Sequence, residues 1–178
     1  MSNASNLKNE VTLQGSTIVY PTSACPPTWG HADIMMRAAK KFSRLLWVVA
    51  TNPHKLNSYP FSADERMDMM KAYVAYYKLK NVEVHHCSST VIRFAKKEGA
   101  SFLLRGLRNT TDFQMELELA AGNRGIDKEI ETICFFSKPH YATISSSLVR
   151  ELAILDEEID QYVLPSLSPF IKSKLKKQ

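Results

Sequence analysis

Five short apolar segments alternate with helical patterns along most of the chain, and this alternation limits the fold more than any other feature. The segments are STIVY (16–20), LLWVVAT (45–51), VEVHH (82–86), SFLLR (101–105) and ETICFF (131–136). Most are apolar on both faces, as strands are when helices cover both sides of a parallel sheet. We therefore predict an α/β fold with a doubly wound, five-stranded parallel sheet, in which the strand at 16–20 is central.

The stretches between these strands carry helical spacing and helix-end signals. Ser62 with Glu65 and Thr111 with Gln114 fit the capping-box pattern of helix N-termini, and Gly99 suits a helix C-terminus. Helices are predicted over 31–43, 62–78, 90–99 and 111–124, and from near residues 145, 157 and 166. The last three would give the domain its C-terminal helices.

Composition and length suggest one domain over 16–178, preceded by a flexible polar segment over 1–15. The three cysteines are far apart and lack ligand spacing, so neither a disulfide framework nor a zinc site is expected. No apolar run approaches the roughly 20 residues of a membrane span. The net charge of +5 arises from basic residues at strand ends and in the tail, without interleaved aromatic residues. We therefore expect a cytoplasmic protein that binds neither membranes nor nucleic acid.

Ligands of such sheets bind beyond the C-terminal ends of the strands, so the loops there are the candidate site. The first loop ends in TWGH (28–31), where Gly30 permits close approach of a ligand and His31 occupies the first turn of a helix. Free N–H groups and the helix dipole favour anions at that position. His31 is therefore a candidate phosphate donor, or simply a helix-start residue. Lys55, in the second loop, can reach a phosphate or only be solvated.

Two further loops carry potential anion donors. Arg105 and Arg108 flank Gly106 in RGLR, where two guanidinium groups suit phosphate recognition. The alternative is a structural ion pair with Asp112 or Glu116. In the last loop, ISSS, three successive serines begin a helix and could direct hydroxyls and free amides at one point. The alternative there is ordinary N-capping, which needs one serine.

Together the ordered pieces YP…TWGH, NPHK, RGLR…DF…E and ISSSLVR resemble the nucleotidylyltransferase superfamily, from about Ile18 to Leu164. Within it, RGLR followed by DF is similar to phosphopantetheine adenylyltransferase of the bacterial type. The resemblance implies a Rossmann-like fold and transfer of the adenylyl group of ATP to 4′-phosphopantetheine, which yields dephospho-coenzyme A and pyrophosphate. It also implies a need for Mg²⁺, assembly into a homohexamer, and catalysis without a covalent intermediate or a protein base.

The resemblance also assigns roles to residues. His31 matches the catalytic residue that stabilises the transition state, and no residue matches a metal ligand. The ATP-binding residues would be Ser23, His31, Gly106, Leu107, Arg108, Glu116, Tyr141, Ala142, Thr143, Ile144, Ser145, Ser146 and Ser147. The acceptor-binding residues would be Ser23, Lys55, Val91 and Arg105.

The first loop departs from the family pattern Y-P-G-[ST]-F-D-P, because it reads YPTSACP. Thr22 replaces a glycine and would make a positive φ costly, while Ala24 and Cys25 replace an aromatic residue and an aspartate. We expect weaker binding of the acceptor than of ATP, and better turnover when the three family residues are restored. Two alternatives stay open: another nucleotidyl transfer, such as to nicotinate mononucleotide, and a degenerate nucleotide- or coenzyme A-binding protein without turnover.

Overall fold

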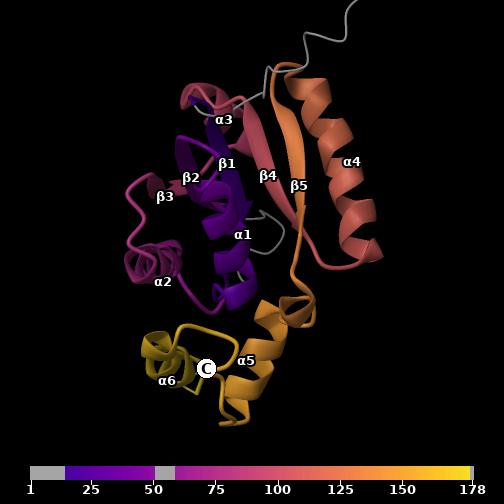
Figure 1. Ribbon diagram of the computed structural model, residues 1–178. Coiled ribbons are helices and arrows are strands. Elements are labelled where there is room, and N and C mark those ends of the chain that lie inside the picture. Colours follow the sequence, from indigo (N-terminus) through magenta and orange to yellow (C-terminus); the bar gives the residue numbers. More distant parts are fainter. Residues whose placement is uncertain (1–14, 51–58, 177–178) are drawn as a thin grey trace, which may run out of the picture.

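A computed structural model describes residues 15–50 and 59–176 and confirms the predicted sheet. Five parallel strands lie in the order β3-β2-β1-β4-β5, with β1 in the centre (Figure 1). The strands are β1 (Thr17–Thr22), β2 (Arg44–Ala50), β3 (Val82–Cys87), β4 (Phe102–Leu107) and β5 (Glu131–Phe136).

Six helices are described with the sheet. They are α1 (Trp29–Ala39), α2 (Ala63–Tyr76), α3 (Val91–Lys97), α4 (Thr110–Ile126), α5 (Ser146–Ile154) and α6 (Ser168–Leu175). Short 3₁₀ turns, η2 (Pro139–Tyr141) and η3 (Pro165–Leu167), precede α5 and α6. Figure 1 shows α5 and α6 beyond the end of the sheet at which β5 finishes. None of the helices in the described ranges is long and apolar enough to cross a membrane.

The structure confirms two helix-end predictions and corrects two others. Ser62 and Glu65 form the reciprocal capping box of α2, and Gly99 follows α3 with a φ of +67°. The box at Thr111 was wrong: α4 starts earlier, and the Asn109 side chain accepts the N–H of Asp112 at 2.8 Å. The helix from 157 was also wrong: the carboxylate of Glu158 accepts the N–H groups of residues 159 and 160 and so competes with helical hydrogen bonds.

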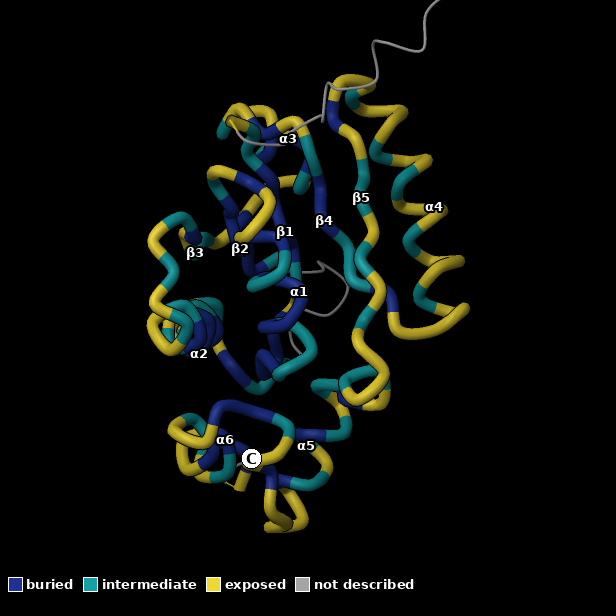
Figure 2. The backbone as a smooth tube through the Cα atoms, viewed as in Figure 1, coloured by how far each residue is buried: buried dark blue, intermediate teal, exposed yellow. Residues whose placement is uncertain are grey.

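Side chains alternate between two apolar clusters on opposite faces of the sheet. On one face Ile18 and Tyr20 of β1 pack with α1 and α2, and on the other Val19 packs with α3. This arrangement confirms the doubly wound fold, and Figure 2 shows the strands in the middle of the sheet as the most buried part. A third cluster joins α5 and α6 to Phe61 and Cys25. It covers the C-terminal edge of the sheet, where the candidate site lies.

Candidate active site

His31 lies in the first turn of α1 and is held by the residue that caps this helix. Thr28 is extended and buried, and its backbone N–H donates to Nδ1 of His31 at 3.1 Å. The Thr28 hydroxyl lies 2.9 Å from the same nitrogen. Because Nδ1 accepts these bonds, the ring proton belongs on Nε2, which is left as a donor. Burial, with the nearby charge of Arg108, lowers the pKa of His31 to about 4, so the ring is neutral at pH 7.

Arg108 directly follows β4 and lies near His31. Its Nε and Nη2 donate to the two carboxylate oxygens of Asp112 at 2.9 and 3.1 Å, and Nη1 reaches the carbonyl of Ile144 at 3.5 Å. The guanidinium thus spans from α4 to the loop before α5, and its charge acts on His31. Arg108 is exposed, and its charge lies near the imidazole of His31.

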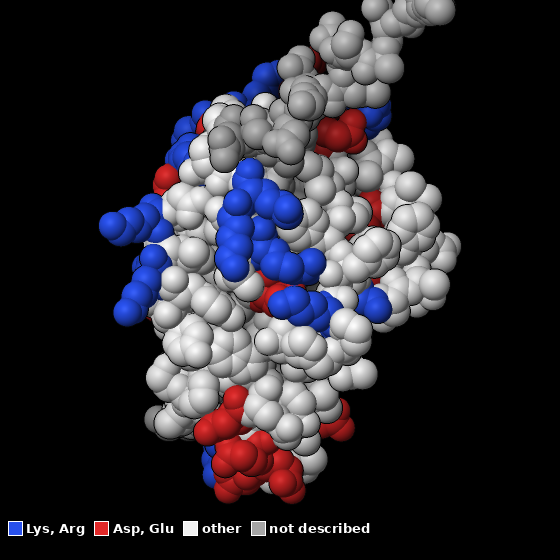
Figure 3. All heavy atoms as spheres, in the orientation of Figure 1, with Lys and Arg blue, Asp and Glu red and all other residues white. Residues whose placement is uncertain are grey.

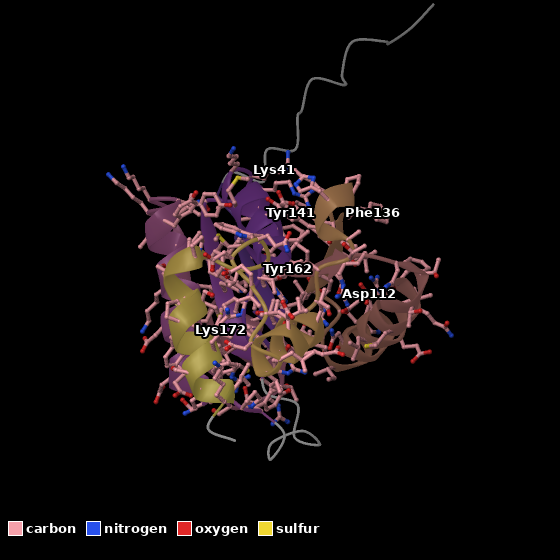
Figure 4. All side chains as sticks on the ribbon, turned by 90° about the horizontal axis from the view of Figure 1, so that it is seen from below. Lys41, Asp112, Phe136, Tyr141, Tyr162 and Lys172 are labelled. Carbon is pink, nitrogen blue, oxygen red and sulfur yellow. The ribbon has the colours of Figure 1, made fainter. Side chains whose placement is uncertain are left out.

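Tyr141 completes this group from the turn η2. A Cβ atom placed on Gly30 would lie 3.7 Å from the Tyr141 carbonyl oxygen and 3.8 Å from its Cβ, so the turn lies against the start of α1. Lys138 fixes the turn by pairing with buried Asp33 of α1 at 2.9 Å. Figure 4, seen from the C-terminal helices, places Tyr141 beside α1 and Asp112 on α4.

The three serines of ISSS serve different purposes. The Ser145 hydroxyl accepts the N–H of Leu148 at 3.1 Å and is the N-cap of α5, as the capping alternative requires. Ser146 donates to the carbonyl of Pro26 at 2.8 Å, and Ser147 accepts from Arg150 at 3.2 Å. Ala142 and Thr143 lie in the turn just before. The start of α5 is therefore bound to the first loop, with its free amides at the same edge as His31.

Arg105 is paired with an acid, as the structural alternative predicts. Its Nε and Nη2 donate to Glu116 of α4 at 2.5 and 2.6 Å, and Nη1 lies 3.4 Å from the carbonyl of Pro21. Along β4 it follows Leu103 by two residues, so it points to the face covered by α3. Val91, at the start of α3, packs on that same face.

The candidate residues thus form two groups at one edge of the sheet. His31, Arg108 and the loop 141–147 lie toward α1 and α5, while Arg105 and Val91 lie toward α3. Glu116, assigned to ATP by the resemblance, belongs to the second group because it holds Arg105. Gly106 packs next to Ile34, and the side chain of Leu107 is buried, so neither offers a side chain to a ligand. Lys55 lies in 51–58, outside the described residues.

The first loop connects the two groups, and its backbone differs from the expectation. Thr22 ends β1 and accepts the indole N–H of Trp47 at 3.0 Å, whereas the positive φ of +46° is at Ala24. The prediction of a costly positive φ at Thr22 was therefore wrong. Ser23 is exposed, and its carbonyl accepts a hydrogen bond from Arg66 at 3.0 Å. Cys25 is buried in the C-terminal cluster.

Several anchoring residues were not predicted from the sequence. Thr28 orients His31, while Arg66 and Arg150 donate to carbonyls of the first loop, the latter at 2.6 Å to Cys25. The spacing of Thr28 and His31, three residues apart at a helix start, is a capping signal that could have identified the first pair. The two arginine contacts join segments distant in sequence and have no local signal.

The acidic residues of the site do not fit a protein-held metal. Asp112 and Glu116 are both engaged by arginines. Across 15–50 and 59–176, no three or more His, Cys, Asp or Glu side chains gather in a way that could hold a metal ion. Mg²⁺ commonly binds through substrate phosphates and keeps several waters. Figure 3 shows Lys and Arg side chains over α1, and Asp and Glu side chains gathered over the C-terminal helices.

A parallel sheet with a helix-borne histidine and a second helix N-terminus at its C-terminal edge is typical of α/β proteins that bind nucleotides. The sequence pattern of the Cytidylyltransferase-like family matches residues 19–152, most of the chain. The chain therefore belongs to this nucleotidylyltransferase family.

Solved structures share the fold at low sequence identity. A protein of Vibrio parahaemolyticus assigned as a nicotinate-nucleotide adenylyltransferase superposes with a TM-score of 0.68 at 15% identity, covering 92% of this chain and 96% of that one. The nicotinic acid mononucleotide adenylyltransferase of Plasmodium falciparum, complexed with NaAD, gives 0.64 at 13% identity, with 91% and 95% covered. A lipopolysaccharide core biosynthesis protein of Thermoplasma volcanium gives 0.51 at 14% identity, with 69% and 98% covered.

Proposed function

We propose that the chain transfers the adenylyl group of ATP to 4′-phosphopantetheine and releases pyrophosphate. The observation that carries the proposal is the neutral His31, whose Nε2–H is a donor near Arg108, and Arg108 in turn reaches the carbonyl of Ile144 just before α5. Such preorganised donors suit a reaction in which negative charge develops on phosphate oxygens. The membership of the nucleotidylyltransferase family supports the reaction class.

In this reaction an oxygen of the acceptor phosphate attacks the α-phosphorus of ATP, and the bond to the pyrophosphate oxygen breaks. His31 would donate to an α-phosphate oxygen, while Arg108 and the amides of α5 would hold the other phosphates. Arg105, Ser23 and Lys55 would hold the acceptor phosphate. The chain then contributes position and charge, which supply large rate factors without a covalent intermediate. Mg²⁺ would enter with the phosphates of ATP and screen their charge.

The division of the candidate residues into two groups supports the choice of two anionic substrates. The donors assigned to ATP lie toward α1 and α5, and Arg105 lies toward α3 across the first loop. The motif RGLR followed by DF favours phosphopantetheine as acceptor. The homohexamer implied by the same resemblance stays a prediction.

A second acceptor is favoured by a specific observation. Two of the structures that share the fold are described as adenylyltransferases for nicotinate mononucleotide. Transfer to nicotinate mononucleotide would use the same His31 and Arg108, and only the acceptor group would differ.

One assay separates these functions. Purified protein with ATP and Mg²⁺ is offered phosphopantetheine, nicotinate mononucleotide and glycerol or choline phosphate derivatives, and pyrophosphate release is measured. We expect the highest kcat/KM with phosphopantetheine. A higher kcat/KM with nicotinate mononucleotide would show that this compound, and not phosphopantetheine, is the acceptor. Binding of ATP without release of pyrophosphate would indicate a non-catalytic binding protein.

A further inference from the structure

Asp33 carries a buried carboxylate to which the proposed reaction gives no role. It lies in α1, two residues after His31, and its side chain is only 3% exposed. A buried charge is costly unless it is paired, and Asp33 is paired twice. Its Oδ2 lies 2.9 Å from Nε of Arg37, and its Oδ1 lies 2.9 Å from Nζ of Lys138. Two cations on one carboxylate are more than neutralisation requires, so the cluster has a purpose beyond charge balance.

Both cations anchor the same stretch of chain, which leads from the end of β5 into η2. Nη2 of Arg37 donates to the carbonyl of Phe136 at 2.7 Å, and its Cζ lies 5.2 Å from the ring centroid of Phe135. Lys138 follows two residues after Phe136 and is the N-cap residue of η2. Figure 1 shows this stretch passing α1 on its way to α5. Asp33 therefore acts on the stretch twice, once through each cation.

The anchored stretch leads directly into the loop that holds ATP in the proposed function. The N–H of Tyr141 donates to the carbonyl of Lys138 at 2.9 Å, and the N–H of Ile144 donates to the carbonyl of Tyr141 at 3.1 Å. Ser145 then caps α5. Because these turns are short and hydrogen-bonded in succession, the position of Lys138 sets the position of the loop 141–147.

The contacts of α1 thus reach both the imidazole and this loop. We propose that Asp33 is a positioning residue for ATP, which holds the loop 141–147 at the distance from His31 that the nucleotide spans. The inference rests on the proposed function, in which His31 donates to the α-phosphate and the loop holds other parts of ATP. Thr28 fixes the orientation of His31, and Asp33 fixes the opposite side of the site. One helix therefore sets the distance between the two.

The sign of one effect separates positioning from electrostatics alone. ATP is an anion, so removal of the Asp33 charge makes the site more positive and, through the field alone, strengthens ATP binding. A positioning role predicts weaker binding, because Arg37 and Lys138 lose their common partner and the loop loosens. A role in stability alone predicts a lower free energy of unfolding and an unchanged Kd of ATP for the folded protein.

Calorimetry of ATP binding in the absence of any acceptor tests the proposal on the purified full chain. In Asp33→Asn we expect the Kd of ATP to rise about 3–30-fold, the range for residues that act through a network of contacts. Asp68→Asn removes an exposed carboxylate that pairs with Lys71 on α2, and it should leave this Kd unchanged. A Kd that is equal or lower in Asp33→Asn would overturn the positioning role.

Lys138→Met makes the same test on a side chain that is half exposed, so it does not depend on a change in the core. We expect a similar rise in the Kd of ATP, whereas Lys41→Met, which removes an exposed cation just after α1, should have little effect. The double variant Asp33→Asn, Lys138→Met should bind ATP about as well as Asp33→Asn alone, because both changes break one contact. Additive effects would show that Asp33 does not act through Lys138.

Amide hydrogen exchange without ligand separates a failure of this inference from a failure of the proposed function. The amides of Tyr141, Ala142 and Ile144, which donate within the loop, should exchange faster in Asp33→Asn, and those of α2 should not. An unchanged chain that binds no ATP would overturn the proposed function and this role with it. If the unchanged chain binds ATP but exchange in the loop is the same in Asp33→Asn, only the positioning role is wrong.

Discussion

Thr28 and His31 are joined at a single ring nitrogen: the backbone N–H and the hydroxyl of Thr28 lie 3.1 and 2.9 Å from Nδ1 of His31. The relationship fixes both the tautomer and the orientation of the ring, because an accepting Nδ1 leaves the proton on Nε2. Helix capping and the proposed catalysis therefore depend on the same two residues.

Loss of the Thr28 hydroxyl should weaken the orientation of the His31 imidazole without removing this side chain. In Thr28→Val the backbone N–H still donates, so we predict a kcat lower by about 2–10-fold, the effect of about 0.5–1.5 kcal/mol for one hydrogen bond. The pKa of His31 should rise toward its ordinary value, because the neutral ring loses one of its donors. Nuclear magnetic resonance of the ring nitrogens and steady-state kinetics measure both effects. Thr28→Ser should restore them, and equal defects in the Ser and Val variants would contradict the role of the hydroxyl.

Removal of the imidazole should act on turnover rather than on binding. In His31→Ala we predict that kcat falls about 10²–10³-fold, as when one donor to a developing oxyanion is removed. The Kd of ATP, measured by calorimetry, should change far less, because the donor matters most where charge develops. Equal losses of binding and turnover would make His31 a ground-state contact only.

The depressed pKa of His31 predicts a specific dependence of stability on pH. The folded value of about 4 lies below the ordinary 6.5, so the unfolded chain binds more protons between these values. The contribution of the neutral His31 ring to the free energy of unfolding is therefore present in full above pH 6.5, and it is lost as the pH falls toward 4. At about 1.4 kcal/mol per pH unit and proton, we predict a loss of about 1–2 kcal/mol between pH 6.5 and 5.

Urea unfolding at both pH values measures this loss, and His31→Gln is the matched control. The other four histidines are the same in both proteins, so only the difference between the proteins reports on residue 31. An equal loss of unfolding free energy in the two proteins would show that the ring is not kept neutral by the fold.

The fold and one side of the candidate site were predictable because their signals are local. Apolar strands and helical spacing predicted a parallel sheet with β1 at its centre, and TWGH predicted His31 at a helix start. The pairing of Arg105 with Glu116 was only one of two possibilities, because the sequence does not show which face of the sheet a strand-end arginine takes. The burial of Cys25 depends on α5 and α6, which are far away in sequence.

Glu116 provides a test of whether Arg105 binds the acceptor phosphate. Its carboxylate holds Arg105 through two hydrogen bonds, although the resemblance assigns it to ATP. In Glu116→Gln the charge-assisted pair is lost, and we predict that KM for the acceptor rises several-fold more than KM for ATP. Asp112→Asn, which weakens the corresponding pair with Arg108, should show the reverse preference. A larger rise in KM for ATP in Glu116→Gln would favour the assignment from the resemblance.

Restoring the aromatic residue of the family pattern in the first loop should cost stability. Ala24 is fully buried against the α1 face of the sheet, and its φ is +46°. A phenylalanine has no space there and must displace its neighbours, so we predict that Ala24→Phe loses about 1–3 kcal/mol of unfolding free energy. Ala24→Gly relieves the left-handed backbone but removes a buried methyl group, and these opposing effects of about 1 kcal/mol each should nearly cancel.

The triple variant Thr22→Gly, Ala24→Phe, Cys25→Asp should therefore gain no turnover, contrary to what the family pattern suggests. It also removes the Thr22 hydroxyl that accepts from Trp47, and it places a carboxylate at a site that is 3% exposed among Phe61, Met69 and Val149. Urea unfolding and steady-state kinetics with phosphopantetheine decide the matter on the same samples. A triple variant that unfolds like the unchanged protein and has a higher kcat/KM would show that the loop tolerates the family residues and that its present sequence limits acceptor use.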